Sequence, residues 1–576
     1  MKRLLKNGMA AAALLTVLLA AALPARAEIK DEKYLKMRNE VKSLYLVQSL
    51  LSWFVRTQGE RSVFQESYVG HEDLFSKENI LYFDKLLKKN GLSTDDRRMV
   101  QYMKNAFLLE FVSLDTAHFD DEINNAESGA TVKLDWEPKP VPYQQIMVMM
   151  AQEKDPEKRQ KLQAAQAKVW KEKLNPIYEK QEERVQQLSK ALGYSDYVAL
   201  SQDYRAVNLK DLIAKSQNFY KETDALYRKL LAEEVDAAMG VPVSKFTRAD
   251  IQYLASVPHM KQFFPAELVV PAFTYFLEGM GLDLKSAAGT EIKIDDELRD
   301  KKEPRAACYS MTVPDDVRIT VKPSGGVSDF ETFFHEGGHA LHFANTKNPN
   351  WEFQQLGNNA VTEGFAGFFE SIWGEYEWLV KYRELVKNYN KFRKPEDRVP
   401  VMKDRDIGLL IRNRVFWDIY MARRYNGAKL IYETILHGGS PDIYKGFYKG
   451  QTKDPQQAYK ALFSDAYGFQ LSDSDALRFR TDVDSFFYAV DYARAFLLAA
   501  QMNESMRKKH GVKWFSDPKA GKLLREKLWT DGGKLQADEL AKLIGSTDAN
   551  YGKFKERIDR RMKIVKKLLG ESKGNK

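Results

Sequence analysis

Apolar residues recur at three- and four-residue spacing over long stretches of this chain, and this spacing constrains the fold more than any other feature. Over residues 207–239 the pattern predicts one long amphipathic helix, which Gly240 and Pro242 should end. Similar patterns predict helices over residues 34–55, 144–192, 405–436 and 486–506. We therefore expect a mostly α-helical fold.

Strand signals are few and lie together. Residues 291–294, 307–313 and 317–321 are the best candidates, and the turn at 314–316 separates the last two. The segment 323–326 then breaks the chain. Ser328 and Glu331 have the S-x-x-E spacing of a capping box, which predicts that a helix begins near Ser328.

The length and composition are those of a large globular protein. The chain has 576 residues, 44% of them hydrophobic and 29% charged, which favours one large domain or two lobes that share a cleft. Its single cysteine, Cys308, excludes an intramolecular disulfide. The stability of the fold must therefore come from the size of the core.

The first 27 residues combine a basic start, an apolar centre and the small-x-small ending Ala25-Arg26-Ala27, which predicts a secretory signal peptide cleaved after Ala27. The alternative is a membrane anchor, but the apolar centre is short and Pro24 interrupts it. Removing the segment lowers the formal net charge from +9 to +5 because it carries four basic residues and no acid. The mature chain has no basic block with interleaved aromatics, which argues against a nucleic-acid partner. We expect a periplasmic or secreted protein without a stable membrane anchor.

Residues 333–343, FFHEGGHALHF, hold three of the chain's eight histidines. On the predicted helix, His335 and His339 are one turn apart on the same face, as two ligands of one metal ion must be. Glu336 completes the H-E-x-x-H pattern and is the candidate general base. The alternative is a structural pair of histidines. His342 lies toward the same face, where a polar core role is favoured over metal ligation.

A catalytic zinc site commonly takes three protein ligands and leaves one position for water. The downstream segment NNAVTEGFAGFFES, residues 358–371, offers Glu363 and Glu370. The interval from His339 to Glu363 allows a loop and a second helix packed beside the first, so Glu363 is the predicted third ligand. Glu370, seven residues later on the same face, is predicted to hydrogen-bond a ligand histidine. The alternative for Glu370 is an ordinary buried acid.

Two glycines lie inside the predicted histidine helix. Gly337 and Gly338 each cost a helix roughly 1 kcal/mol relative to alanine. They are expected where another element approaches the helix backbone closely.

With these residues placed, the segment from about Asp300 to Gly511 resembles the glutamate-zincin peptidases, which include angiotensin-converting enzyme, the thimet-type oligopeptidases and the Taq-type carboxypeptidases. The resemblance implies a large two-lobed helical zincin fold with a deep substrate channel and a small β element beside the zinc helix. It also implies a single peptidase domain over residues 28–576. Residues 28–300 would form a helical lid and channel wall, and residues 301–576 the catalytic half.

The resemblance implies one zinc ion per chain on His335, His339 and Glu363, with Glu336 as general base. In the segment YAVDYARAFLLAAQMNESM, it places the oxyanion-binding tyrosine at Tyr492. Tyr488, one turn earlier, would contact substrate. The alternative for either tyrosine is a place in the core.

One position departs from the converting-enzyme pattern. Ten residues before the tyrosine, where those enzymes have a histidine, this chain has Asp482. Arg480 occupies the place of a lysine that binds the terminal carboxylate of the substrate, and an arginine can bind a carboxylate through two hydrogen bonds. Ala306 and Cys308 match the strand edge that pairs with the substrate backbone.

The predicted function is therefore that of an exported zinc metallopeptidase that hydrolyses short peptides and releases C-terminal dipeptides. Carboxypeptidase or internal oligopeptidase cleavage is the alternative within the same superfamily. The alternative from another class is a catalytically silent peptide-binding protein, although such a protein would have no need of Glu336 or Tyr492.

Overall fold

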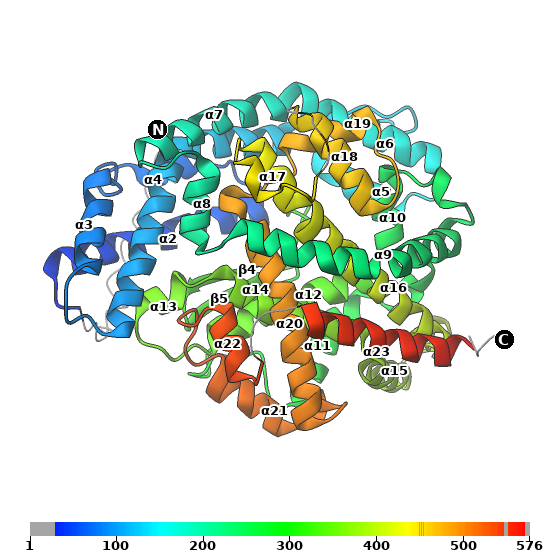
Figure 1. Cartoon of the computed structure of the whole chain (residues 1–576). Coiled ribbons are helices and arrows are strands. Elements are labelled where there is room, and N and C mark those ends of the chain that lie inside the picture. Colours follow the sequence, from blue (N-terminus) through cyan, green and yellow to red (C-terminus); the bar gives the residue numbers. More distant parts are fainter. Residues whose placement is uncertain (1–28, 449, 451, 453, 547–550, 571–576) are drawn as a thin grey trace, which may run out of the picture.

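The computed structural model describes residues 29–448, 450, 452, 454–546 and 551–570, so the predicted signal peptide at residues 1–27 lies outside it. The fold is mostly helical, as expected (Figure 1). The helices before the sheet are α2 (Glu32–Gln58), α3 (Lys77–Leu87), α4 (Thr94–Gly129), α5 (Ile146–Gln152), α6 (Pro156–Val169), α7 (Asn175–Ala191), α8 (Tyr197–Arg205), α9 (Leu209–Met239), α10 (Ile251–Ala255) and α11 (Val269–Gly279).

The second half of the chain begins with the helix that carries the histidines. Its helices are α12 (Val327–Ala344), α13 (Trp351–Gln355), α14 (Asn359–Glu370), α15 (Tyr376–Asn390), α16 (Asp404–Ala422), α17 (Leu430–Leu436), α18 (Pro455–Tyr467), α19 (Asp473–Ala476), α20 (Ala489–His510), α21 (Pro518–Leu523), α22 (Ala537–Leu543) and α23 (Tyr551–Leu569). Figure 1 shows α12, α14 and α20 in the middle of the molecule, with α2, α3 and α4 at one side and α7 across the top.

The predicted helices are present, with one division that the periodicity missed. The helix predicted over residues 207–239 is α9, which ends at Gly240 in the left-handed conformation. The single pattern over residues 144–192 is wrong as one helix, because α5 ends at Gln152 and Pro156 begins α6. Proline lacks the N–H that would continue the helix, and the apolar spacing resumes after it without a visible change of period.

A three-stranded sheet lies beside α12, at the place where the sequence predicts strands. Strand β4 (Ala307–Thr312) pairs antiparallel with β5 (Asp316–Thr320), and β3 (Lys293–Asp295) pairs parallel with β5 on its other side. A two-stranded ribbon of β1 (Thr131–Val132) and β2 (Val141–Pro142) lies elsewhere in the chain. Since β5 is the central strand, β4 is an edge strand, and among the described residues no strand pairs with its other side.

The start of α12 differs from the capping-box prediction. The helix begins at Val327, its N-cap is Gly326, and no side chain caps it. Glu331 instead forms an ion pair with Arg414 of α16, and Asp329 accepts hydrogen bonds from the backbone N–H groups of Ser324 and Gly325. The capping box was wrong because a buried arginine from a distant helix competes for Glu331, which the local spacing does not reveal.

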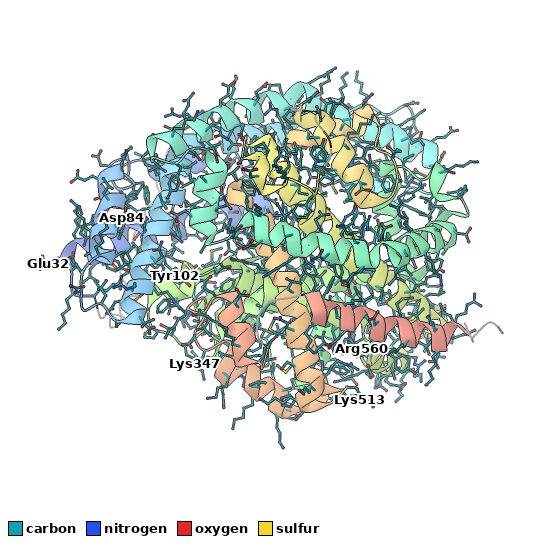
Figure 2. All side chains as sticks on the ribbon, in the orientation of Figure 1. Glu32, Asp84, Tyr102, Lys347, Lys513 and Arg560 are labelled. Atoms are coloured by element: carbon teal, nitrogen blue, oxygen red, sulfur yellow. The ribbon has the colours of Figure 1, made fainter. Side chains whose placement is uncertain are left out.

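Two apolar clusters form most of the core. The larger one runs from α9 to α23 and includes Phe273, Phe334 and Trp373 around α12. The second one packs α2, α3 and α4 together and takes in Phe353 and Phe486 from the other half of the chain. Charged side chains such as Glu32, Lys347 and Lys513 are exposed at the rim (Figure 2). Within the described residues, no helix has both the length and the apolar character required to span a membrane.

Candidate metal centre

Helix α12 presents His335 and His339 one turn apart, and a hydrogen bond fixes each ring. His335 Nδ1 lies 2.9 Å from Glu370 Oε2, and His339 Nδ1 lies 2.8 Å from Thr362 Oγ1. Each bond engages Nδ1, so the two Nε2 atoms are the ones that face each other, 3.2 Å apart. Such partners are the usual way in which a ligand histidine is oriented.

Helix α14 brings Glu363 to the same point. Glu363 Oε2 lies 3.4 Å from His335 Nε2 and 3.6 Å from His339 Nε2, and it has no hydrogen-bond partner although it is buried. Ligands of a tetrahedral zinc ion at about 2.1 Å from the metal are roughly 3.3 Å from each other. Both the donor set and its spacing therefore fit a zinc ion. Among the described residues, His335, His339 and Glu363 are the group of three whose ligand atoms converge within 4.8 Å.

The two glycines of α12 explain how the helices approach so closely, as the sequence predicts. A Cβ atom on Gly338 would lie 2.7 Å from Ala366 Cα in α14, and one on Gly337 would lie 2.3 Å from the ring of Phe273 in α11. Real Cβ contacts are not that short. The glycines therefore let α14 carry Glu363 up to the two histidines while α11 closes the opposite side.

Burial and the neighbouring charges set the protonation of the cluster. Burial lowers the pKa of His339 to about 3, so this ring is neutral, as a metal ligand must be. Burial would raise the pKa of Glu363, but the two histidines and the Tyr488 hydroxyl overcome this effect and lower the pKa to about 2. For His335, burial lowers the pKa, while Glu363 and Glu370 raise it well above its ordinary value. The cluster thus holds an ionised acid between two imidazoles.

Glu336 lies next to the cluster, against the free edge of β4. Burial raises the pKa of its carboxyl group, while the charge of His335 and a hydrogen bond from the Cys308 backbone N–H lower it. A carboxyl group with a raised pKa is better matched to accepting a proton near neutral pH. Cys308 is partly buried, and burial raises the pKa of its thiol.

Two tyrosines of the segment predicted to bind the oxyanion and the substrate approach the cluster. The Tyr488 hydroxyl donates a hydrogen bond to Glu363 Oε1 at 2.8 Å. The ring of Tyr492 lies 5.0 Å from the rings of both Tyr488 and Tyr425. Burial, and then the charge of Glu363, raise the pKa of Tyr492, so its hydroxyl stays protonated. The Tyr492 hydroxyl is therefore available as a donor at neutral pH, whereas that of Tyr488 already donates to Glu363.

Other predicted site residues lie apart from the cluster. Arg480 pairs with Glu179 at 3.0 Å, and within the described residues no hydrogen bond or ion pair connects it to the histidines or Glu363. Asp482, at the position of the missing histidine, is buried and forms ion pairs with Arg424 and Lys429. Ala306 is buried just before β4.

His342 is buried, and its ring packs 4.8 Å from that of Phe365. Burial lowers its pKa to about 4. Its ring packs against aromatic rings. It is not one of the three residues whose ligand atoms converge.

Sequence reasoning missed two residues around the cluster. Thr362 orients His339, and Tyr425, in a π-helical turn at Arg423–Lys429, packs against Tyr492. Thr362 directly precedes Glu363, so its place beside a predicted ligand was the one available signal. Tyr425 had no such signal, because a distant helical segment brings it to the site.

Comparisons with known proteins find a structural relative and no sequence relative. No family model and no curated protein matches the chain. A crystal structure of a candidate oligoendopeptidase F from Bacillus anthracis strain Ames matches with a TM-score of 0.62 at 15% sequence identity, covering 95% of this chain and 94% of that one. The chain therefore shares the fold of that structure over nearly its whole length, and His335, His339 and Glu363 meet inside it.

Proposed function

We propose that this protein is a zinc metallopeptidase that hydrolyses short peptides. The observation that carries the proposal is the convergence of His335 Nε2, His339 Nε2 and Glu363 Oε2, with Glu336 directly beside them. The likeness of the fold to a structure described as a candidate oligoendopeptidase F supports the same class of reaction.

In the proposed reaction, each residue around the cluster has a separate role. When bound, zinc polarises the scissile carbonyl and makes water a better nucleophile at neutral pH. Glu336 takes the proton of the attacking water and delivers it to the leaving amine. Tyr492 donates a hydrogen bond to the oxyanion that develops on the carbonyl oxygen. The free edge of β4, from Ala306 to Cys308, offers backbone groups that align the peptide.

The cleavage position is the finer part of the proposal. If Arg480 holds the free carboxylate of the substrate, C-terminal dipeptides are released, but it must first exchange its partner Glu179. The structural relative instead favours internal cleavage of oligopeptides. Export through the signal peptide at residues 1–27 would place the enzyme in the periplasm or outside the cell.

One experiment tests both the zinc-dependent peptidase activity and the position of cleavage. The purified protein, with and without a chelator, is given a mixed library of short peptides in free-acid and amidated forms, and mass spectrometry identifies the products. We expect one zinc ion per chain and loss of cleavage on chelation. Full activity in chelator, or no transition metal after reconstitution, would refute the zinc site. Products shorter by two residues from free acids alone support dipeptide release, and efficient internal cleavage of amidated peptides supports an oligopeptidase.

A further inference from the structure

A polar cavity lies apart from His335, His339 and Glu363, which we call the metal cluster. It has a volume of about 220 Å³, and its wall includes Arg248, Arg424, Arg478, Gln163, Gln166 and Trp417. We call it the arginine pocket. These residues come from α6, a short turn at Arg248–Asp250, α16 with the π-helical turn that follows it, and the turn at Leu477–Arg480.

Arg248 sets this pocket apart from the rest of the interior. Arg248 is 8% exposed, and in the part of the chain that the structure describes no carboxylate lies within ion-pair distance of it. The other buried arginines of the described chain each pair with an acid, namely Arg159, Arg205, Arg414, Arg423, Arg424, Arg557 and Arg561. A buried charge without a partner costs several kcal/mol. This chain pairs its other buried arginines, so the unpaired Arg248 indicates that a partner comes from outside.

The acids near the other two arginines of the pocket already have partners of their own. Arg424 and Arg478 both pair with Asp482, Arg478 at 3.6 Å, so two of the three pocket arginines share one carboxylate and Arg248 is not paired with it. The charge of Asp475 also acts on Arg248, but its carboxylate already accepts the Ser472 N–H at the start of α19. The pocket therefore has an excess of positive charge.

Buried donors in the wall also lack partners. Gln163 is 5% exposed; its Oε1 accepts a hydrogen bond from Arg248 at 2.6 Å, while its Nε2 has no partner. The Nε of Arg248 and the Nε1 of Trp417 are likewise buried and unpartnered, as is one acceptor, the Oε1 of Gln166. Unsatisfied buried donors around excess positive charge are the features of a site that accepts an anion with more than one oxygen.

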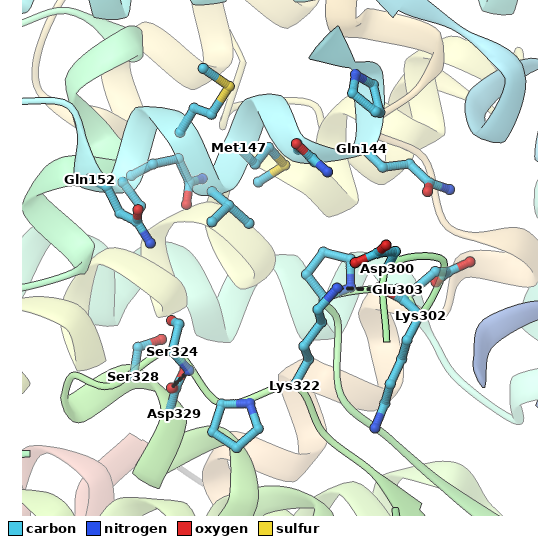
Figure 3. Close-up of a pocket in the computed structure, with 18 of the residues that line it drawn as sticks. Gln144, Met147, Gln152, Asp300, Lys302, Glu303, Lys322, Ser324, Ser328 and Asp329 are labelled. Atoms are coloured by element: carbon cyan, nitrogen blue, oxygen red, sulfur yellow. Dashed lines mark hydrogen bonds between the residues drawn. The ribbon is translucent and has the colours of Figure 1, made fainter. Parts of the chain in front are cut away.

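The pocket adjoins a cavity large enough for a peptide. This larger cavity has a volume of about 1190 Å³ and shares Met147, Gln252 and Ala255 with the arginine pocket. Figure 3 shows Gln144 with Met147 and Gln152 of α5 on one side of it, and Lys302, Lys322 and Ser324 on the other. Ser328 and Asp329 of α12 also line it. Ser328 precedes His335 by seven residues, which is about 10 Å along the helix axis.

We propose that the arginine pocket binds a carboxylate group, supplied by the C-terminus or an acidic side chain of a peptide that lies in the larger cavity. This inference rests on the proposed peptidase function for the identity of the ligand. It assigns carboxylate recognition to Arg248, with Arg424 and Arg478 beside it, and makes Arg480 a neighbour outside the pocket.

The test uses the full chain with Glu336→Gln, which should bind peptides without cutting them. Calorimetry compares an acetylated alanine hexapeptide with a free C-terminus, the same peptide amidated, and an amidated version with one glutamate. We expect the peptides with a carboxylate to bind about 10- to 100-fold more tightly than the amide. Adding Arg248→Gln should abolish this difference, and Arg248→Lys, which keeps the charge but loses the planar fork, should leave an intermediate one. Arg405→Gln, an exposed change on α16, is the matched control.

A second arm needs neither peptide nor metal. Sodium acetate should raise the Tm of the metal-free wild type and leave the Tm of Arg248→Gln unchanged, with sodium chloride at equal ionic strength as reference. Without acetate, Arg248→Gln should be at least as stable as wild type, because it removes an unpaired buried charge. This arm reports on the pocket even if the chain cleaves no peptide.

The outcomes separate the possibilities. If Arg480→Ala, and not Arg248→Gln, removes the preference for the free acid, the carboxylate binds at Arg480 and the proposal is wrong. An Arg248-dependent effect of acetate without any preference for acidic peptides would overturn the peptide as the source of the carboxylate. Chloride stabilising as well as acetate, or no response to either, would overturn carboxylate binding itself.

Discussion

The metal cluster and the arginine pocket are both buried and charged, but they are built in different ways. Two helices that pack through Gly338 bring His335, His339 and Glu363 together, and each charge in the cluster has a partner. The arginine pocket collects side chains from distant segments and leaves Arg248 without an acid. We propose that a cation completes the cluster and that an anion completes the pocket.

The difference shows how unmatched groups indicate a ligand. In the cluster, the unpartnered Glu363 Oε2 faces two nitrogens whose other ring atoms are already bonded. In the pocket, three of the unpartnered atoms are donors, on Arg248, Gln163 and Trp417, and one is an acceptor, Gln166 Oε1. Buried Glu375 shows the contrasting case of internal pairing: it binds Arg507, Arg560 and Arg561, and each of these arginines also has a second acid. Glu363 Oε2 and Arg248 lack such pairing, and each lies where other unmatched groups converge.

The largest expected effect belongs to the chemistry at the cluster. Glu336→Gln should lower kcat by about 10²- to 10⁴-fold while zinc content and peptide affinity stay unchanged, because the base acts only on the reacting water. Steady-state kinetics and metal analysis measure the two quantities. Glu297→Gln, at an exposed acid, is the control. Equal inactivity of wild type and variant on every peptide would favour a binding protein.

The next largest expected effect is on stability and belongs to Asp482, the acid that Arg424 and Arg478 share. Asp482→Asn should lower the free energy of unfolding by about 3–5 kcal/mol, because it removes the acid that Arg424 and Arg478 share. Burial would raise the pKa of Asp482, but Arg424, Arg478 and Lys429 overcome this effect and lower it. Its stabilisation is therefore fully present above its unfolded pKa of about 3.9 and is lost only as the pH falls well below that value.

Urea denaturation at neutral pH measures the effect of Asp482→Asn. Asp135→Asn, which breaks the exposed pair with Lys161, should change the stability by less than about 1 kcal/mol. Similar small values for both variants would mean that the arginine network does not depend on Asp482, and the contrast between the two regions would weaken.

A comparison of the two acids of α14 tests which one holds the metal. Glu363→Gln should weaken zinc binding more than Glu370→Gln, for which about 10- to 100-fold is expected of a residue that only orients a ligand histidine. Competition with a chromogenic chelator gives both affinities. The reverse order would identify Glu370 as the ligand.

The smallest effect concerns the packing that brings the two helices together. Gly338→Ala should destabilise the fold by about 1–3 kcal/mol, because its Cβ would lie 2.7 Å from Ala366 Cα. Gly129→Ala is the control: it ends α4 with nothing within 4 Å of the added atom, so it should be neutral or slightly stabilising. Thermal unfolding distinguishes them. A neutral Gly338→Ala would show that α14 can move away without cost.

Local patterns predicted the helices, the sheet beside α12 and the three residues of the metal cluster. They failed where a distant partner intervened, as at Glu331, which pairs with Arg414 and so does not form the predicted capping box. They also missed Thr362 and Tyr425, since nothing near either residue shows which ring it will contact.

The sequence by itself determined that α12 presents two histidines on one face with Glu336 beside them, because a helix repeats every 3.6 residues and the four-residue spacing follows from that repeat. It also determined that α12 tolerates a close neighbour, since Gly337 and Gly338 have no side chain to obstruct one. Only the tertiary structure decided that Arg248 is buried without an acid and that Asp482 serves two pocket arginines. The reason is that pairing of buried charges depends on which distant segments meet, and no local period records that.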